Sequence, residues 1–318
     1  MCCLFGLLDY SYSMDSGKKE RILSVLSREC EERGTDATGI AYVSRNRLRI
    51  FKRPLPAHRM RFHIPEDSPV IMGHTRMATQ GNRKYNANNH PFEGRCGNAK
   101  FALAHNGVLH NDRILREQHS LPATRIQTDS YVAVQLLEEE KALSFDSLKK
   151  MAETVEGSFT FTLLDMENSL YFVKGSSPMC IYHFPKTRFY LYASTEQILW
   201  AAVQKLKLSK LPHETVSIQC GDILKIDSRG NISTAAFKAT DLYSCFPGFT
   251  RSFCYPPYHS CEPHGNPKAQ EEDYLEELRE YAGYYGYSPD YIDFLYSRGY
   301  TCEDIEEIFY GEDILGGF

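Results

Sequence analysis

Strand-like and helix-like segments alternate in blocks along the first 240 residues. The densest block covers 158–237, where apolar and β-branched runs such as SFTFTLLD (158–165) and RFYLYAS (188–194) are separated by turn-forming residues. A helical segment at 195–206 carries the only tryptophan and interrupts this block. Blocks of strands lying between helices favour layered α and β structure over a single doubly wound sheet.

The upstream part of the chain continues this alternation. The apolar run CLFGLL (3–8) predicts a short buried strand, and 17–32 predicts a helix. TGIAYV (38–43) and RLRIFK (47–52) flank a short polar turn and predict a hairpin. The remaining predicted elements are strands at 69–75, 100–106, 169–175, 180–184, 216–219, 221–227 and 231–237, and helices at 128–141 and 144–155.

The composition of the chain changes near residue 240. Residues 241–270 are rich in Pro, Gly and aromatic residues and follow no structural period, which predicts a linker or an irregular segment. Residues 271–318 predict a small helical tail module, in which Ser288 is a good N-cap and Pro289 suits a first helical position. We therefore expect a main domain over 1–240 and a tail that could dock onto a partner.

Composition and charge exclude several classes of protein. The formal net charge of -5 gives no footprint of a nucleic-acid binder. A basic strip from Arg45 to Arg53 alternates with apolar residues and is interpreted as the solvated face of a strand. No stretch approaches the roughly 20 apolar residues that cross a bilayer, and no secretory signal is visible. The 10 cysteines are therefore interpreted as reduced thiols, and we expect a cytoplasmic protein without a membrane partner.

Two adjacent thiols, Cys2 and Cys3, follow the initiator methionine. If Met1 is removed, Cys2 gains a free α-amine, whose reference pKa is about 8. Such an amine can act as general base for the thiol of its own residue, so one residue supplies both nucleophile and base. Because a cysteine at position 2 is by default without function, this hypothesis depends on the residues downstream.

Polar groups suited to one substrate stand at the ends of predicted strands and at a helix start. Arg76 ends GHTR (73–76), where a guanidinium can clamp a carboxylate through two hydrogen bonds. Asn106 and Gly107 follow another strand and can offer a side-chain amide and a backbone N–H to an oxyanion. Asp129 can accept hydrogen bonds from an ammonium group. Together with a thiol nucleophile, these groups fit a γ-carboxamide amino acid, glutamine.

Five motifs in order resemble those of the class II glutamine amidotransferases, whose glutaminase domain is an N-terminal-nucleophile hydrolase. Family signatures look like CGIFG, RGxD(S/A)xG, GHTRWAT, HNG and (S/T)D(T/S)E, and this chain has CCLFG, RGTDATG, GHTRMAT, HNG and TDSY at corresponding places. The resemblance covers about the first 240 residues. It implies an α+β fold, a four-layer αββα sandwich, here with a small C-terminal helical appendage.

The resemblance also implies a role for each matched residue. Cys2 resembles the nucleophile and its α-amine the base, while Asn106 and Gly107 look like the oxyanion hole. This chemistry requires no metal and no organic cofactor. The implied substrate-binding residues are Arg76, Thr79, Gln80 and Asp129, and the implied supporting residues are Arg33 and His105.

Three positions depart from the family pattern. Cys3 stands where the family usually has Gly, and we expect it to pack inertly at the start of the first strand. Met77 replaces a common Trp in a loop that the family closes over bound glutamine, so lid closure or glutamine affinity could change. Tyr131 stands where an acidic residue is frequent. None of the three removes an implied catalytic group.

Two loose sets of metal-ligating residue types are interpreted without a metal. The first set matches family patterns that hold no metal, and its side chains are expected to hold loops by hydrogen bonds. The second set lies in the predicted linker and lacks the tight paired spacing of zinc sites. The sets are His74, His90 and His105, and Cys245, Cys254, Cys261 and His264.

Full synthases of the resembled family append a large acceptor domain, whereas only about eighty residues follow residue 240 here. We therefore expect hydrolysis of L-glutamine to glutamate and ammonia through a Cys2 thioester. The ammonia would pass to solution or to a separate synthase or acceptor protein, with the tail module (271–318) as a plausible attachment point. Two alternatives stay open: a hydrolase of γ-glutamyl amides or peptides such as glutathione, and a non-catalytic module that senses glutamine.

Overall fold

A computed structural model describes residues 2–82, 84–239, 275, 279, 288–300 and 305. The chain divides into two compact units, Met1–Cys254 and Tyr255–Phe318. The described strands of the first unit are β1 (Cys3–Asp9), β2 (Ala37–Ser44), β3 (Arg47–Arg53), β4 (Val70–Arg76), β5 (Phe92–Cys96), β6 (Ala99–Leu109), β7 (Gly157–Asp165), β8 (Leu170–Lys174), β9 (Cys180–Phe184), β10 (Phe189–Ala193), β11 (Glu214–Thr215), β12 (Asp222–Ile226) and β13 (Ile232–Ala236).

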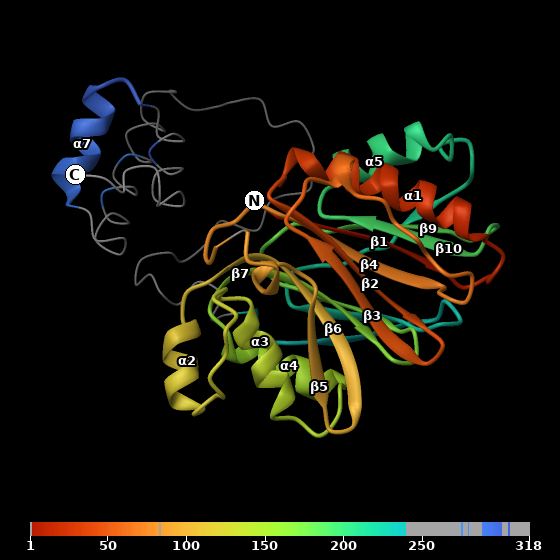
Figure 1. The fold of residues 1–318 in the computed structure, drawn as a ribbon, viewed down its shortest axis with the longest axis horizontal. Coiled ribbons are helices and arrows are strands. Elements are labelled where there is room, and N and C mark those ends of the chain that lie inside the picture. The colour runs from red at the N-terminus through yellow and green to blue at the C-terminus, as the bar shows by residue number, and fades with distance from the viewer. Residues whose placement is uncertain are drawn as a thin grey trace. The chain divides into compact units, whose positions relative to one another are not determined.

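These strands form two antiparallel sheets. One sheet has the order β11-β9-β10-β1-β4-β2-β3, and the other has the order β13-β12-β8-β7-β6-β5. Among the residues that the structure describes in this unit, two pairs of helices cover the outer faces (Figure 1), and one more helix precedes the second pair in sequence. The helices are α1 (Ser16–Glu29) and α5 (Glu196–Lys205) on the first sheet, α3 (Tyr131–Glu138) and α4 (Phe145–Thr154) on the second, and α2 (Asp112–Gln118).

Three apolar cores separate the four layers. One core joins α1 and α5 to the first sheet, one lies between the sheets, and one joins the second sheet to α3 and α4. β1 contributes to two of them: Phe5 faces the helices and Leu4 faces the other sheet. A strand buried on both faces is expected to be apolar throughout, which explains the continuous run at 3–8. The structure thereby confirms the predicted αββα sandwich.

Local sequence explains where the main elements begin and turn. The side chain of Asp15 accepts a hydrogen bond from the backbone N–H of Lys18 at 2.8 Å and caps α1. Thr195 caps α5 through the backbone N–H of Ile198 at 3.3 Å. The predicted hairpin of β2 and β3 turns at Arg45 and Asn46, which both have positive φ. Such a two-residue turn matches the twist of paired antiparallel strands.

Some predicted elements differ from the structure. Residues 216–219 form no strand, and the neighbouring Glu214–Thr215 pairs with β9 instead. Strand β5 and helix α2 lie outside the predicted elements, because Gly94 interrupts the first and neither a periodic run nor a side-chain capping bond marks the second. The other described elements of the first unit follow the predicted order.

The described part of the second unit contains one complete helix, α7 (Pro289–Ser297). Ser288 precedes it with extended backbone and Pro289 opens it as predicted, but the Ser288 side chain makes no capping hydrogen bond. Ile292 and Leu295 are its buried residues. Most of the remaining tail within 271–318 and the linker cysteines lie outside the described residues.

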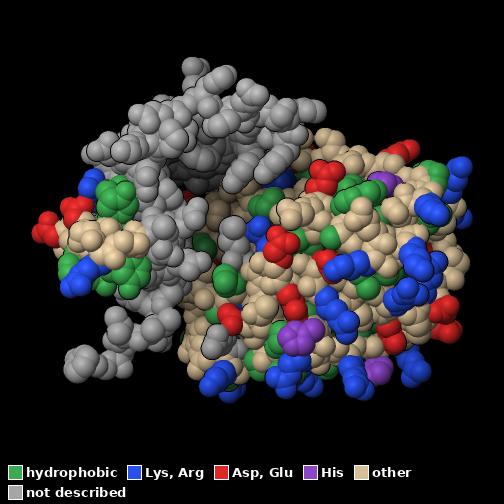
Figure 2. Space-filling model, turned by 90° about the horizontal axis from the view of Figure 1, so that it is seen from above, with side chains coloured by type: hydrophobic (Ala, Val, Ile, Leu, Met, Phe, Trp, Pro, Cys, Tyr) green, Lys and Arg blue, Asp and Glu red, His purple; other side chains and the backbone are tan. Residues whose placement is uncertain are grey.

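The surface of the described residues is mixed in charge. On the face shown in Figure 2, Lys and Arg side chains are interspersed with Asp and Glu side chains. Within the described ranges, no helix combines the length and the apolar character that crossing a bilayer requires.

Candidate active site

Cys2 lies directly before β1, which occupies the middle of the first sheet. Its thiol donates to the backbone carbonyl of Met77 at 3.4 Å, and Nε of Arg33 donates to the Cys2 carbonyl at 3.0 Å. Burial by the surrounding protein raises the pKa of the Cys2 thiol, although the side chain is still partly exposed. The sulfur is therefore held mainly as a thiol and needs a base to become a nucleophile.

Cys3 points away from Cys2, because side chains alternate along a strand. It is fully buried in the core under α1, where its Sγ lies 3.0 Å from Sγ of Cys30. Burial, together with the contact to Cys3, raises the pKa of Cys30 well above its usual range. The second thiol of the opening motif thus belongs to the helix-covered core.

Arg76 ends β4, and its guanidinium is nearly enclosed at 2% exposure. One nitrogen donates to Oδ1 of Asn89 at 2.8 Å, and the other donates to the backbone carbonyls of Gln80 and Gly81. The loop after β4 therefore folds back over the guanidinium. Thr79, in the same loop, is exposed.

Asp129 is buried just before α3 and faces the same loop. Its carboxylate accepts hydrogen bonds from the backbone N–H of Leu109 at 2.7 Å and from the Ser130 hydroxyl at 3.4 Å. Its own N–H donates to Oε1 of Gln80 at 3.0 Å. His105 Nδ1 contacts the Ser130 hydroxyl at 2.8 Å, so this histidine braces the segment that carries the carboxylate.

Asn106 and Gly107 lie in β6 of the second sheet. Asn106 is buried, and its Nδ2 donates to Oγ of Ser194 at 3.2 Å. Gly107 has a φ of +139°, and a Cβ placed there would lie 2.0 Å from the carbonyl oxygen of Ser158. Only glycine avoids that contact, so the position next to the amide is restricted to one residue type.

The structure brings most of the predicted site residues together at one end of the two sheets. The charges of Arg76 and Asp129 act on the Cys2 thiol in opposite directions, Arg76 lowering its pKa and Asp129 raising it. Gln80 joins the loop over Arg76 to Asp129. Asn106 reaches the first sheet through its hydrogen bond to Ser194.

Comparisons with known proteins agree with this arrangement. A family profile described as a glutamine amidotransferase domain matches residues 74–201. The glutamine–fructose-6-phosphate aminotransferase of Staphylococcus aureus (strain Mu50) is 30% identical over 241 residues, which are 73% of this chain and 38% of that protein. The corresponding Staphylococcus epidermidis enzyme (strain RP62A) is 31% identical over 190 residues, 57% of this chain and 30% of that protein. The chain contains a class II glutamine amidotransferase domain.

Solved structures show the same fold for the amidotransferase domain. The glutamine phosphoribosylpyrophosphate amidotransferase of B. subtilis aligns with a TM-score of 0.59 and 19% identity, covering 74% of this chain and 49% of that one. The allosteric regulatory enzyme of purine biosynthesis aligns with a TM-score of 0.60 and 17% identity, with the same coverage. The chain thus spans less than half the length of each of these four relatives.

The prediction that Lys52 lies on the solvated face of a strand is wrong. Instead of lying on a solvated strand face, its ammonium donates to the backbone carbonyls of Asn89 and Pro91 and lies 4.9 Å from the centre of the Phe92 ring. Burial lowers its pKa to about 8, with a smaller contribution from the charge of Arg76. No sequence pattern signals this contact, because the covering segment lies far along the chain.

Three histidines are buried in the amidotransferase domain, and His105 faces the layer of α3 through its contact with the Ser130 hydroxyl. Nε2 of His74 contacts the backbone carbonyl of His105 at 3.0 Å, and the His74 ring lies 4.2 Å from that of His90. Neither ring nitrogen of His90 has a hydrogen-bond partner among the described residues. In that part of the chain no group of three or more His, Cys, Asp or Glu side chains is placed to hold a metal ion.

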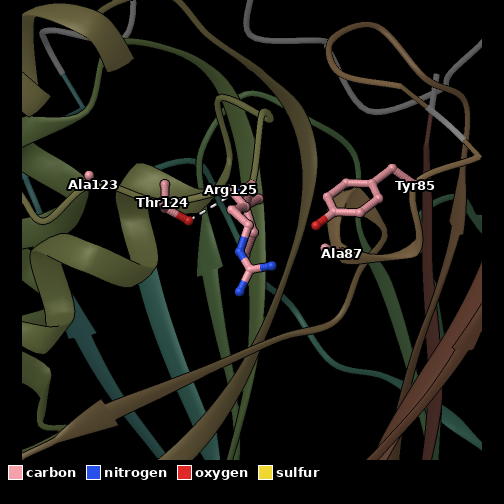
Figure 3. Close-up of a pocket in the computed structure, with 6 residues that line it drawn as sticks. Tyr85, Ala87, Ala123, Thr124 and Arg125 are labelled. Carbon is pink, nitrogen blue, oxygen red and sulfur yellow. Dashed lines mark hydrogen bonds between the residues drawn. The ribbon is translucent and has the colours of Figure 1, made fainter.

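A surface pocket of about 570 Å³ is lined in part by Tyr85 and Ala87. Tyr85 and Arg125 face each other across it in Figure 3. It is formed by two segments that also hydrogen-bond to each other, since Gln127 contacts Asn88 twice at 2.9 Å. The lining residues are Tyr85, Ala87, Ala123, Thr124, Arg125 and Ile126, and none of them is a predicted site residue.

Proposed function

We propose that the amidotransferase domain hydrolyses the side-chain amide of L-glutamine to glutamate and ammonia. The observation that carries the proposal is the common location of a thiol, a guanidinium and a carboxylate, with an Asn-Gly pair tied to the strand of the thiol. These are the groups needed to attack a carboxamide and to hold both ends of an amino acid. The residues are Cys2, Arg76, Asp129, Asn106 and Gly107.

In the proposed reaction, removal of Met1 gives Cys2 a free α-amine that takes the thiol proton. The raised pKa of the thiol supports a mechanism in which the proton leaves only during attack. The sulfur bonds to the carboxamide carbon, and the oxyanion accepts hydrogen bonds from the side-chain amide of Asn106 and the backbone N–H of Gly107. The α-ammonium group of Cys2 then gives the proton to the departing nitrogen, the carbon–nitrogen bond breaks, and ammonia leaves. Water hydrolyses the remaining thioester to glutamate and regenerates the thiol.

Arg76 and Asp129 are proposed to hold the α-carboxylate and the α-ammonium of glutamine. The carbonyls of Gln80 and Gly81 occupy the guanidinium of Arg76, so a substrate carboxylate would displace them and reorder the loop. Thr79 lies in that loop and would join the carboxylate site only after such a change. Arg33 and His105 would act as supports, through the Cys2 carbonyl and the Ser130 hydroxyl.

The fate of the ammonia is a separate part of the proposal. We propose that it passes to an acceptor on another protein, with residues 271–318 as the docking module and 241–270 as the linker to the main domain over 1–240. A cytoplasmic location is part of the proposal, because a reducing compartment keeps the proposed nucleophile and the other cysteines from forming disulfides.

The test is intact-mass analysis after treatment with a glutamine-like diazoketone, alongside kinetic assays with glutamine and glutathione. We expect loss of Met1 and one adduct on Cys2, together with turnover of glutamine. Cys2→Ala should lose the adduct and lower kcat at least about 10³-fold. The matched control is Cys220→Ala, which removes another partly exposed thiol outside the site.

Active protein that retains Met1 would contradict the mechanism. Turnover of glutathione without turnover of glutamine would favour a γ-glutamyl hydrolase. A sensing module would be favoured by two results together: the wild-type protein does not turn over glutamine, and Cys2→Ala binds glutamine as tightly as the wild type does.

A further inference from the structure

Ser194 makes a contact in the amidotransferase domain that the proposed mechanism does not use. It directly follows β10 and is completely buried. Its Oγ accepts a hydrogen bond from the backbone N–H of Leu4 at 2.9 Å and one from Nδ2 of Asn106 at 3.2 Å. One hydroxyl therefore joins the strand of the nucleophile to the strand of the oxyanion amide.

The strand register explains why a side chain is used at this point. The pairing of β1 with β10 ends at Phe5 and Ala193, so Leu4 lies beside Ser194 just past the end of the ladder. The Ser194 hydroxyl supplies the acceptor for the Leu4 N–H there. Ser194 lies on the same face as Tyr192, which belongs to the core between the sheets. That face is directed at β6 and therefore at Asn106.

We propose that Ser194 is a positioning residue that fixes the Asn106 amide relative to Cys2. This inference rests on the proposed glutaminase function. The Nδ2 group carries two hydrogens, and the bond to Ser194 uses one of them, so the amide plane is set and the other hydrogen is left for the oxyanion. Cys2 is only two residues from Leu4, so the same hydroxyl ties the nucleophile and the oxyanion donor to one point.

A donor that is already oriented stabilises the transition state more than one that must reorient during the reaction. Without the Ser194 hydroxyl, the Asn106 amide could rotate and the Leu4 N–H would lose its partner. The first effect lowers kcat, whereas the second lowers stability. The experiment must separate them.

The matched pair Ser194→Thr and Ser194→Val provides this separation, because the two side chains have nearly the same shape and differ in the hydroxyl. We expect Ser194→Thr to stay within about threefold of the wild-type kcat and Ser194→Val to lose about 10- to 100-fold, a part of the loss seen on removing a whole donor. KM for glutamine should change less than about twofold in both variants, since glutamine binds through other groups. Ser68→Ala is the control: it removes an equally buried hydroxyl, bonded to the carbonyl of Val43 at 2.9 Å, beyond the opposite end of β4.

A double-mutant cycle supplies the second measurement. In an Asn106→Ala background, Ser194→Val should lower kcat by less than about threefold, because the amide that it positions is already gone. Equal kcat in Ser194→Thr and Ser194→Val, or multiplicative losses in the cycle, would overturn the inference while leaving the glutaminase intact. A folded wild-type protein without turnover of glutamine would overturn the proposed function itself, and this role with it.

Discussion

Gly107 has a backbone conformation that other residues adopt only with strain. The position combines φ of +139° with a backbone oxygen 2.0 Å from where a Cβ would be. The oxygen belongs to Ser158 of β7, which pairs with β6 and cannot move independently. The glycine beside the proposed oxyanion amide is thus required by strand packing, independently of the proposed reaction.

Gly107→Ala is therefore expected to destabilise the domain by about 3 kcal/mol or more, since it adds a backbone clash to backbone strain. Gly221→Ala is the control, because Gly221 also has positive φ but its nearest neighbour would lie 3.3 Å from the new Cβ. That control should cost about 1–2 kcal/mol. Urea unfolding followed by circular dichroism measures both. Equal losses would show that strain alone decides the position.

Sequence alone can suggest a residue whose expected role depends on its chemical type and on its position at the end of a strand or the start of a helix. Arg76 and Asp129 belong to this group, because their places within the ordered motifs single them out, and their roles stay predictions. Lys52 and Ser194 do not belong to it. Their roles depend on partners that the fold brings from distant parts of the chain, such as Asn89 for Lys52 and Leu4 for Ser194.

The two loops that border the site, 77–90 and 121–130, are joined by hydrogen bonds. The side-chain oxygen of Gln127 accepts hydrogen bonds from the backbone N–H of Asn82 at 3.2 Å and from Nδ2 of Asn88 at 2.9 Å. Gln80 adds a contact between the loop over Arg76 and the N–H of Asp129. The proposed carboxylate and ammonium sites are therefore coupled, so a change that loosens one loop should weaken glutamine binding at both sites.

Gln127→Ala removes the centre of this connection. We expect KM for glutamine to rise about 3- to 10-fold with kcat within twofold, because about two hydrogen bonds that orient the binding groups are lost. Limited proteolysis should also cut residues 80–90 faster. Gln118→Ala, at the exposed end of α2, is the control and should change neither quantity. A variant with unaltered KM and unaltered proteolysis would show that the loops act separately.

At the element scale, the strands buried on both faces were the easiest to predict. β1 and β10 are continuous apolar runs with a single interpretation. β5 was missed because it lies at a sheet edge and alternates buried and exposed residues over only five positions, including Gly94. The strand expected at 216–219 is absent since the chain pairs with β9 slightly earlier, at Glu214 and Thr215.

The interior of the whole domain holds neutral histidines. Burial lowers the pKa of His74 to about 3, lowers that of His90 well below its usual range, and lowers that of His105. In the unfolded chain each of these groups has a pKa of about 6.5. Below that pH the unfolded chain binds protons that the folded domain does not, so stability falls as the pH falls.

We expect the free energy of unfolding to fall between pH 6.5 and pH 5.5 by up to about 1.4 kcal/mol per pH unit for each such histidine. Urea unfolding at several pH values measures the slope. His90→Leu should reduce the slope, whereas His63→Gln should leave it unchanged because that side chain is 89% exposed. Stability that is constant from pH 7 to pH 5.5 would contradict neutral burial of these rings. Carboxylates titrate mainly below this window and do not obscure the result.

The backbone that carries the proposed reacting sulfur is held in place by a central strand. A single peptide bond separates Cys2 from β1, a strand with both edges paired and both faces buried. Adaptation to a new substrate is therefore expected in the two loops that border the site, 77–90 and 121–130, while the strand that carries the sulfur stays fixed. A directed-evolution library for other γ-glutamyl compounds would keep the first strand constant and diversify those loops.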